Sequence, residues 1–115
     1  MTKEKKRSGR PAKDKIAYLK ALIVAEMARA EDIHGPYPED ILRGAAIMCE
    51  EAGEVLEQAL DFTRVKKRNF PMTEDILGIT LLRTEVVQTI VCGLNYLYNI
   101  EENLNKIEEE LRKCR

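Results

Sequence analysis

Residues 49–62 read CEEAGEVLEQALDF, and this stretch predicts one helix with two unlike sides. At about 100° per residue, apolar side chains occupy one half of the helix and acidic side chains the other. The centre of the apolar half contains Ala45, Met48, Ala52, Val55 and Ala59, and its edges contain Leu42, Cys49, Leu56 and Leu60. An apolar half of this width predicts packing against more than one neighbouring helix.

The acidic half has no basic residue to balance it. It contains Glu50, Glu51, Glu54, Glu57 and Asp61, while no Lys, Arg or His occurs between Gly44 and Thr63. Each close pair of like charges costs about 0.2 to 0.5 kcal/mol, or about 1 to 2 kcal/mol in sum, against a total stability of about 5 to 15 kcal/mol. Solvent, a basic segment and a metal ion therefore all stay open as the source of compensation.

Composition indicates one soluble, helix-rich domain. The 115 residues are 44% hydrophobic and 34% charged, with a net charge of −1 and no Trp, so no overall field points to nucleic acid. Three cysteines in no CxxC pattern favour structural thiols in a reducing cytoplasm. The longest apolar region, residues 76–100, includes Arg83 and Glu85, which a membrane span rarely tolerates, so we expect no membrane association.

The first 11 residues predict a disordered basic arm, and residues 12–115 a single all-α domain. Eight of the first 20 residues are Lys or Arg. The segment SGRPAK (residues 8–13) resembles the AT-hook, whose Gly-Arg-Pro core enters the minor groove of DNA, but Ser8 stands where the first Arg of that core is usual. We therefore expect a solvated tail, with nucleic-acid contact only weakly through this arm.

Three or four helices follow the arm and predict an antiparallel bundle. The first spans about residues 12–33 and ends at HGPYP (residues 34–38), because Gly and Pro break helices. The second begins near Pro38 and reaches about Phe62, before a basic connection, TRVKKRNFPM (residues 63–72). The third opens after an N-cap at Thr73 and reaches at least Tyr98. A heptad-like stripe follows at Ile100, Leu104, Ile107 and Leu111, either on a fourth helix or on a continuation of the third.

The third helix carries an acid that needs a partner. Between residues 76 and 100 only Arg83 and Glu85 are formally charged, so this helix is predicted to be a buried central element. An unpaired buried carboxylate costs several kcal/mol or takes up a proton, and Arg83 projects elsewhere. We therefore expect Glu85 to share a divalent cation with the acidic helix.

The candidate ligands are all oxygen donors: Glu50, Glu51, Glu54 and Glu85, with Gln88 one turn on and Asn95 further along. Such hard ligands suit Mg²⁺, with Mn²⁺ as a second option. A di-iron bundle would need Glu-x-x-His on two helices, whereas the single histidine, His34, is predicted to lie in a loop. A wet acidic face on a purely structural bundle is the alternative that needs no metal.

The segments EEAGE (residues 50–54) and EVVQ (residues 85–88) resemble the MazG-like all-α NTP pyrophosphatases. The signature of that family is Glu-Glu-x-x-Glu on one helix and Glu-x-x-Asp on the next, and the likeness covers about residues 15–100. The resemblance implies Mg²⁺-dependent hydrolysis of an NTP or dNTP to a nucleoside monophosphate and pyrophosphate. It implies Glu50, Glu51, Glu54 and Glu85 as metal ligands, with Glu51 or Glu54 orienting or deprotonating the water.

This chain departs from the family pattern at Gln88, where the family has Asp. An amide oxygen can coordinate a metal but brings no charge and cannot act as a base, which weakens the expected site. The basic run RVKKR (residues 64–68) supplies Lys66, Lys67 and Arg68 as candidates for phosphate binding. The candidates for contact with a nucleobase are Asn95, Tyr96 or Tyr98. A solvated loop explains the basic run equally well, and core packing is the favoured explanation of the two tyrosines.

The width of the apolar surface predicts a homo-oligomer, a dimer or tetramer, that completes the bundle. The second functional hypothesis is a non-catalytic helical oligomer on a MazG-like scaffold, acting as a nucleotide-binding or DNA-associated interaction module. Gln88 and the basic arm favour that alternative.

Overall fold

The computed structural model of the chain describes residues 11–67 and 72–114 and shows three helices in them, with no strand in those ranges. They are α1 (Ala12–His34), α2 (Ile41–Lys67) and α3 (Met72–Lys113). The all-α prediction is therefore confirmed. Residues 1–10, which make up almost all of the predicted basic arm, and Arg68 lie outside the described residues.

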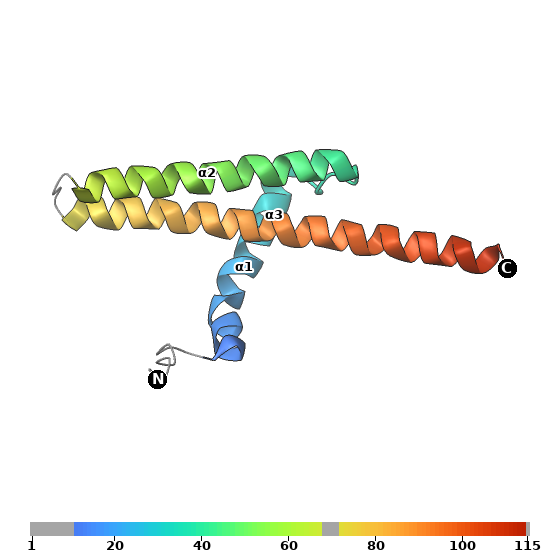
Figure 1. The fold of residues 1–115 in the computed structure, drawn as a ribbon. Coiled ribbons are helices and arrows are strands. Elements are labelled where there is room, and N and C mark those ends of the chain that lie inside the picture. The colour runs from blue at the N-terminus through green and yellow to red at the C-terminus, as the bar shows by residue number, and fades with distance from the viewer. Residues whose placement is uncertain (1–10, 68–71, 115) are drawn as a thin grey trace, which may run out of the picture.

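The helices form a long antiparallel hairpin with a crossing arm. α2 and α3 run side by side, and α1 packs against the middle of α3 at a steep angle, behind the hairpin in the view of Figure 1. α3 extends well past the start of α2, so its C-terminal third has no helix beside it in this chain (Figure 1). The molecule measures 66 × 46 × 25 Å along its principal axes.

The turn between α1 and α2 fixes the direction of the crossing arm. Gly35 adopts φ 73°, which residues with a Cβ rarely reach, and its N–H donates to the Glu31 carbonyl 2.9 Å away. The Asn99 amide of α3 donates to the Pro38 carbonyl at 2.8 Å. A residue predicted only as a helix boundary thus fastens the turn to α3.

α2 begins and ends later than the sequence predicts. It starts at Ile41 instead of Pro38, because the Asp40 side chain acts as the N-cap and accepts the Arg43 N–H at 2.8 Å. It continues to Lys67 instead of ending at Phe62. The Thr63 hydroxyl donates to the Ala59 carbonyl at 2.8 Å, so this residue belongs to the helix and not to a basic connection.

α3 is a single helix of 42 residues, which decides the question left open at Asn99. No Gly or Pro occurs between Leu94 and Lys113 to interrupt it. The Asn103 side-chain amide donates to the Asn99 carbonyl at 2.8 Å. This hydrogen bond spans the helical turn at which a fourth helix could have begun. The helix begins at Met72, one residue before the predicted N-cap.

Close approach of α2 and α3 depends on a small residue at the open end of the hairpin. Gly44 is buried, and a Cβ added to it would lie 2.7 Å from two ring carbons of Tyr96. The Tyr96 hydroxyl donates to the Ile41 carbonyl at 2.9 Å. Tyr96 is partly buried and holds the start of α2 against α3. Tyr98 is 64% exposed, so the core packing predicted for it is wrong for one chain.

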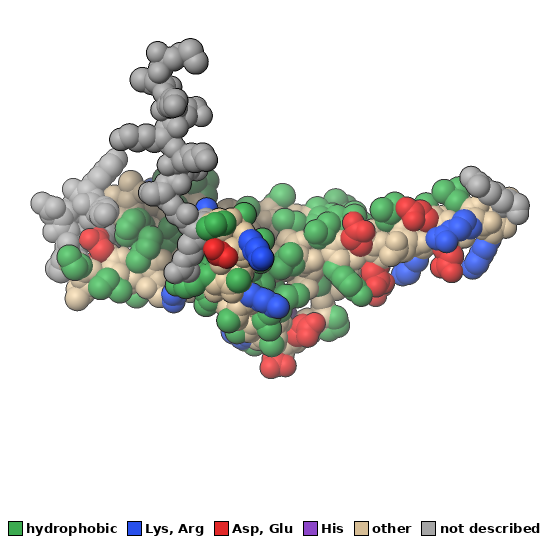
Figure 2. Space-filling model, turned by 90° about the horizontal axis from the view of Figure 1, so that it is seen from below, with side chains coloured by type: hydrophobic (Ala, Val, Ile, Leu, Met, Phe, Trp, Pro, Cys, Tyr) green, Lys and Arg blue, Asp and Glu red, His purple; other side chains and the backbone are tan. Residues whose placement is uncertain are grey.

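The core of the single chain is very small. Val91 and Cys92 are the buried hydrophobic residues among those described, so the prediction that α3 is buried all round is wrong for one chain. The edge residues of the apolar half of α2, Leu42 and Leu56, are 80% and 62% exposed. Hydrophobic side chains cover much of the surface in Figure 2, with charged ones gathered toward the end of α3. The physical reason is that α3 meets only α2 and part of α1.

α3 is also long and apolar enough to cross a membrane by length and composition alone. Core helices of soluble proteins pass the same test.

Candidate metal centre and adjoining pocket

Three of the predicted acids converge where α2 and α3 face each other. One carboxylate oxygen from each of Glu51, Glu54 and Glu85 lies within 4.8 Å of the others, and all three residues are partly buried. We call this group the acidic triad. The Thr89 hydroxyl lies 2.8 Å from the Glu85 carbonyl and 3.3 Å from the Glu51 carbonyl, so it ties the two helices together at the level of the triad.

Glu50 stands apart from the triad, and Gln88 lies in the wall of an adjoining pocket. Glu50 is exposed and outside the group, because it lies one helical position away from Glu51 and turns toward solvent. Gln88 lines a pocket that adjoins the triad, together with Glu51. The sequence therefore identified the centre of the acidic group but included one acid too many.

Burial and mutual repulsion oppose ionisation of two of the triad carboxyl groups. Burial raises the pKa of Glu51, with further contributions from Glu54 and Glu50. Burial also raises the pKa of Glu85, and the neighbouring Glu54 carboxylate adds to that shift. One oxygen of Glu51 and one of Glu85 are buried without any hydrogen-bond partner. A divalent cation binds hard oxygen donors, and these two oxygens have no other partner. The carboxylates of the triad therefore fit Mg²⁺ or Mn²⁺.

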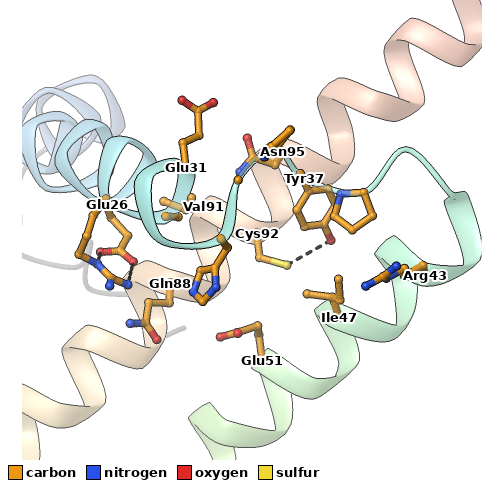
Figure 3. A pocket seen from close by; sticks show the side chains of 16 residues that line it. Glu26, Glu31, Tyr37, Arg43, Ile47, Glu51, Gln88, Val91, Cys92 and Asn95 are labelled. Atoms are coloured by element: carbon orange, nitrogen blue, oxygen red, sulfur yellow. Dashed lines mark hydrogen bonds and ion pairs between the residues drawn. The ribbon is translucent and has the colours of Figure 1, made fainter.

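A pocket of about 580 Å³ opens beside the triad. It lies between the end of α1, the turn at residues 35–38, the start of α2 and the middle of α3 (Figure 3). Glu51 belongs to both the triad and the pocket wall. A ligand in this pocket would therefore contact the triad directly.

Side chains of both charges line the pocket, and its acids are Glu26, Glu31 and Glu51. Arg29, His34 and Arg43 line it. Arg29 pairs with Glu26, its Nε lying 2.8 Å from a carboxylate oxygen, and Figure 3 shows Arg43 and Glu51 projecting from α2 toward the space below α1. Burial raises the pKa of Glu51, and the nearby His34 acts in the opposite direction. The prediction that His34 lies in a loop is wrong: it is the last residue of α1.

Tyr37 and Cys92 form part of the pocket wall. The Tyr37 hydroxyl donates to the Gly44 carbonyl at 2.9 Å and lies 3.3 Å from the Cys92 sulfur. Burial raises the pKa of both side chains, so both stay neutral near pH 7. Cys49, Cys92 and Cys114 are free thiols. Tyr37 and Cys92 therefore hold the turn in place and bring no charge to the pocket.

The predicted substrate-binding residues divide into two groups. Asn95 lines the pocket, as the prediction requires. Lys66 and Lys67 end α2, with side chains outside the described residues, and their backbone lies about 22 Å along the helix from Glu51 at 1.5 Å per residue. Tyr98 is 64% exposed and away from the pocket wall.

Sequence reasoning missed the basic residues of the pocket because they come from two helices separated by a turn. Arg29 lies on α1, His34 at its end and Arg43 in the first turn of α2. The signal that was available is the Gly-Pro turn at residues 35–36, which reverses the chain and carries the end of α1 over the start of α2.

Comparison of the chain with known protein families, with curated proteins and with solved structures finds no match. The functional argument therefore rests on the residues and geometry of the triad and the pocket.

Proposed function

We propose that the chain is a Mg²⁺-dependent nucleoside triphosphate pyrophosphohydrolase of MazG-like type, with Mn²⁺ as an alternative ion. The observation that carries the proposal is the acidic triad, in which Glu51 and Glu85 each hold a buried, unpartnered oxygen. A structural bundle gains nothing from such oxygens, because each costs about 1 to 3 kcal/mol or more. A cation converts the same arrangement into a stable site.

Glu51, Glu54 and Glu85 would hold the cation, and the Gln88 amide oxygen, one turn from Glu85, is available as a neutral ligand. The bound ion would neutralise phosphate charge and activate water for phosphoryl chemistry. In the reaction, a water oxygen bonds to the α-phosphorus, the bond from that phosphorus to the bridging oxygen breaks, and pyrophosphate leaves. Glu51 borders both the triad and the pocket, so we assign to it the orientation of the water and acceptance of its proton.

The pocket would hold the substrate. Its volume of about 580 Å³ lies within the range of about 300 to 1,000 Å³ found for small-molecule sites. Arg29, His34 and Arg43 would neutralise phosphate oxygens that the cation does not reach. The amides of Gln88 and Asn95 would offer both donors and acceptors to a nucleobase.

We place the enzyme in the cytoplasm. The free thiols of Cys49, Cys92 and Cys114 suit a reducing compartment. Arg83 and Glu85, near the middle of the apolar region of α3, oppose insertion of that helix into a bilayer.

The deciding experiment compares two carboxyl-to-amide variants on the same helix. Glu54→Gln removes the charge of a triad member, whereas Glu57→Gln changes an exposed acid one turn later that lies outside the triad. Release of pyrophosphate from a panel of NTPs and dNTPs is measured with and without Mg²⁺. We expect Glu54→Gln to abolish Mg²⁺-dependent release and Glu57→Gln to retain it. If the wild-type protein shows no metal-dependent turnover on any nucleotide, the proposed enzymatic activity is refuted.

The second candidate is a non-catalytic module on the same scaffold that binds nucleotide, or DNA through its arm. Gln88 favours it, because an amide cannot act as a base where the MazG-like pattern has Asp. Calorimetric titration with Mg²⁺, with and without a non-hydrolysable NTP, separates the candidates when combined with the turnover assay: nucleotide binding without hydrolysis selects the module. A salt-dependent DNA shift that disappears on deletion of residues 1–11 would assign the DNA contact to the arm.

A further inference from the structure

The single chain exposes far more surface than a folded protein of its mass. Its accessible surface is 10077 Å², whereas a compact 13.2 kDa monomer exposes about 6,400 Å². Its radius of gyration is 19.2 Å, against about 13 Å for a compact domain of 115 residues. A surface of this size leaves room for the roughly 1,000 to 2,500 Å² that each subunit of an obligate dimer buries. One chain therefore leaves a surface that suffices for a large interface.

The positions that face each other across the hairpin define its two sides. Gly44 meets Tyr96, Met48 meets Gly93, and Phe62 meets Gly78. In an antiparallel pair of helices, the residue after each contact position turns to one side of the hairpin, and the residue before it turns to the other. The two sides can therefore be identified from the sequence and these contacts.

The side formed by preceding residues carries the pocket. Ile47 precedes Met48 and Asn95 precedes Tyr96, and both line the pocket beneath α1. Glu51 of the acidic triad lines the same pocket. This side of the hairpin is already occupied at its centre by an element of the same chain.

The opposite side is apolar and uncovered, and we call it the apolar face. On α2, Cys49 follows the contact residue Met48 and is exposed, and Leu56 lies two turns further on and is also exposed. On α3 the apolar face is a stripe with spacings of three and four, interrupted by Arg83 and by Gly93, where the stripe reaches the contact with α2. Its apolar members, each 38% to 59% exposed, are Ile76, Ile79, Val86, Ile90, Leu97, Ile100, Leu104 and Ile107. This heptad pattern is that of a helix packed along its length against another helix.

We propose that the apolar face binds a second copy of this chain, with α3 antiparallel to α3 of the partner. The apolar pattern repeats along α3, which has 42 residues. Two copies of this face can pack against each other and bury the area that an obligate dimer needs. A parallel two-fold pair would place Arg83 against its own copy inside the apolar stripe. The antiparallel pair, centred near Gly93, places Arg83 beside Glu101 of the partner subunit instead, because the two residues are nine positions before and nine after Cys92.

Gly93 also favours the antiparallel arrangement. The only contact that a Cβ at this position would make within one chain is with Met48, at 3.5 Å. Near the centre of the proposed interface, the absence of a side chain allows the two α3 backbones to approach. A bilayer is a weaker occupant, because a stripe bordered by Arg83 and by Glu101 and Glu108 is not the continuous apolar surface that lipid requires.

The test compares two leucines on opposite sides of α3. Leu97 follows the contact residue Tyr96 and is 52% exposed, whereas Leu77 precedes Gly78 and is 54% exposed. Light scattering and sedimentation measure the molecular mass of wild type, Leu97→Glu and Leu77→Glu over a dilution series, and circular dichroism checks that each variant keeps its helicity. We expect wild type to have twice the 13.2 kDa mass, Leu77→Glu to match it, and Leu97→Glu to raise the dissociation constant about 100-fold.

A charge exchange tests the orientation. Arg83→Glu and Glu101→Arg are each expected to weaken the dimer, and the double exchange to restore it, because the opposite charges then meet again. Equal effects of the two leucine variants overturn the proposed face, and absence of coupling between Arg83 and Glu101 overturns the antiparallel orientation. A monomer in solution that binds phosphatidylcholine and phosphatidylglycerol vesicles makes the bilayer the occupant and overturns the dimer. None of these outcomes depends on nucleotide turnover.

Discussion

The two sides of the α2/α3 hairpin use the same helices for opposite purposes. One side holds partly buried acids and a pocket of mixed charge, covered in part by α1. The other side is a stripe of exposed Leu, Ile and Val residues, interrupted by Arg83 and Gly93. The first side holds carboxylate oxygens without hydrogen-bond partners, and the second side holds apolar side chains that no element of this chain covers.

The difference teaches that the two deficits can be tested separately. A cation would act on the triad within one chain, whereas the apolar face needs a second molecule. Conditions that satisfy one deficit leave the other in place, so variants and solution conditions can change one side at a time.

The largest effect on stability is expected where the two helices touch. Gly44→Ala introduces a Cβ 2.7 Å from the Tyr96 ring, and overpacking of this kind costs about 1 to 3 kcal/mol. Gly53→Ala, on the same helix, meets nothing within 4 Å in one chain and should gain up to about 1 kcal/mol from helix propensity. Urea unfolding measures both. A loss of stability for Gly53→Ala would show that the outer surface of α2 is covered closely.

A smaller effect is expected from pH on the metal-free protein. Burial raises the pKa of Glu51 and Glu85 above the unfolded value of about 4.3. Between the unfolded and the folded pKa the native state binds more protons than the unfolded state, so stability falls as pH rises through that window. The thermal midpoint in EDTA should therefore be higher near pH 5 than near pH 7.5.

Two comparisons assign this pH effect to the triad. Mg²⁺ should raise the midpoint more at pH 7.5 than at pH 5, because the ionised carboxylates are the ones that bind it. Glu85→Gln should flatten the pH dependence. The Arg29 contact lowers the pKa of Glu26 and acts in the reverse sense, so a midpoint that rises toward neutral pH in wild type and in Glu85→Gln alike would contradict the role of the triad.

The smallest effect is expected at the threonine that joins the two helices. Thr89→Val removes a hydroxyl within reach of carbonyls on both α2 and α3 and should cost about 0.5 to 1.5 kcal/mol. Thr84→Val removes a contact of 3.1 Å within α3 alone and serves as the control. Denaturant unfolding measures the difference, and equal costs for the two variants would show that Thr89 adds nothing to the joint.

The sequence was sufficient for the helices and for the core of the candidate site. Periodicity located all three helices, and the isolated acid at Glu85 predicted its convergence with Glu51 and Glu54, because a carboxylate on an apolar helix needs a partner. Helix ends were less accurate. Asp40 was expected inside α2 and caps it instead, since a capping side chain and a first-turn acid look alike in sequence.

The pocket could not be predicted from sequence spacing. Its position depends on the conformation of Gly35 and on the Asn99 contact with Pro38, which set the angle of α1 over the hairpin. Long-range contacts of this kind leave no periodic signal. The burial of α3 was also predicted incorrectly. A hydrophobic pattern indicates which faces of a helix avoid water, but it does not indicate whether the same chain or another chain covers them.

Because α3 is one unbroken helix, a small tilt near its middle moves its C-terminal end by a larger distance. At 1.5 Å per residue the helix is about 63 Å long, and about 36 Å separate Thr89, beside the triad, from Lys113 at the far end. A stiff helix that tilts by about 5° at Thr89 moves its far end by about 3 Å. Small adjustments around the three carboxylates are therefore enlarged at the C-terminal tip, where a displacement of that size is easily measured with a spin label at Cys114.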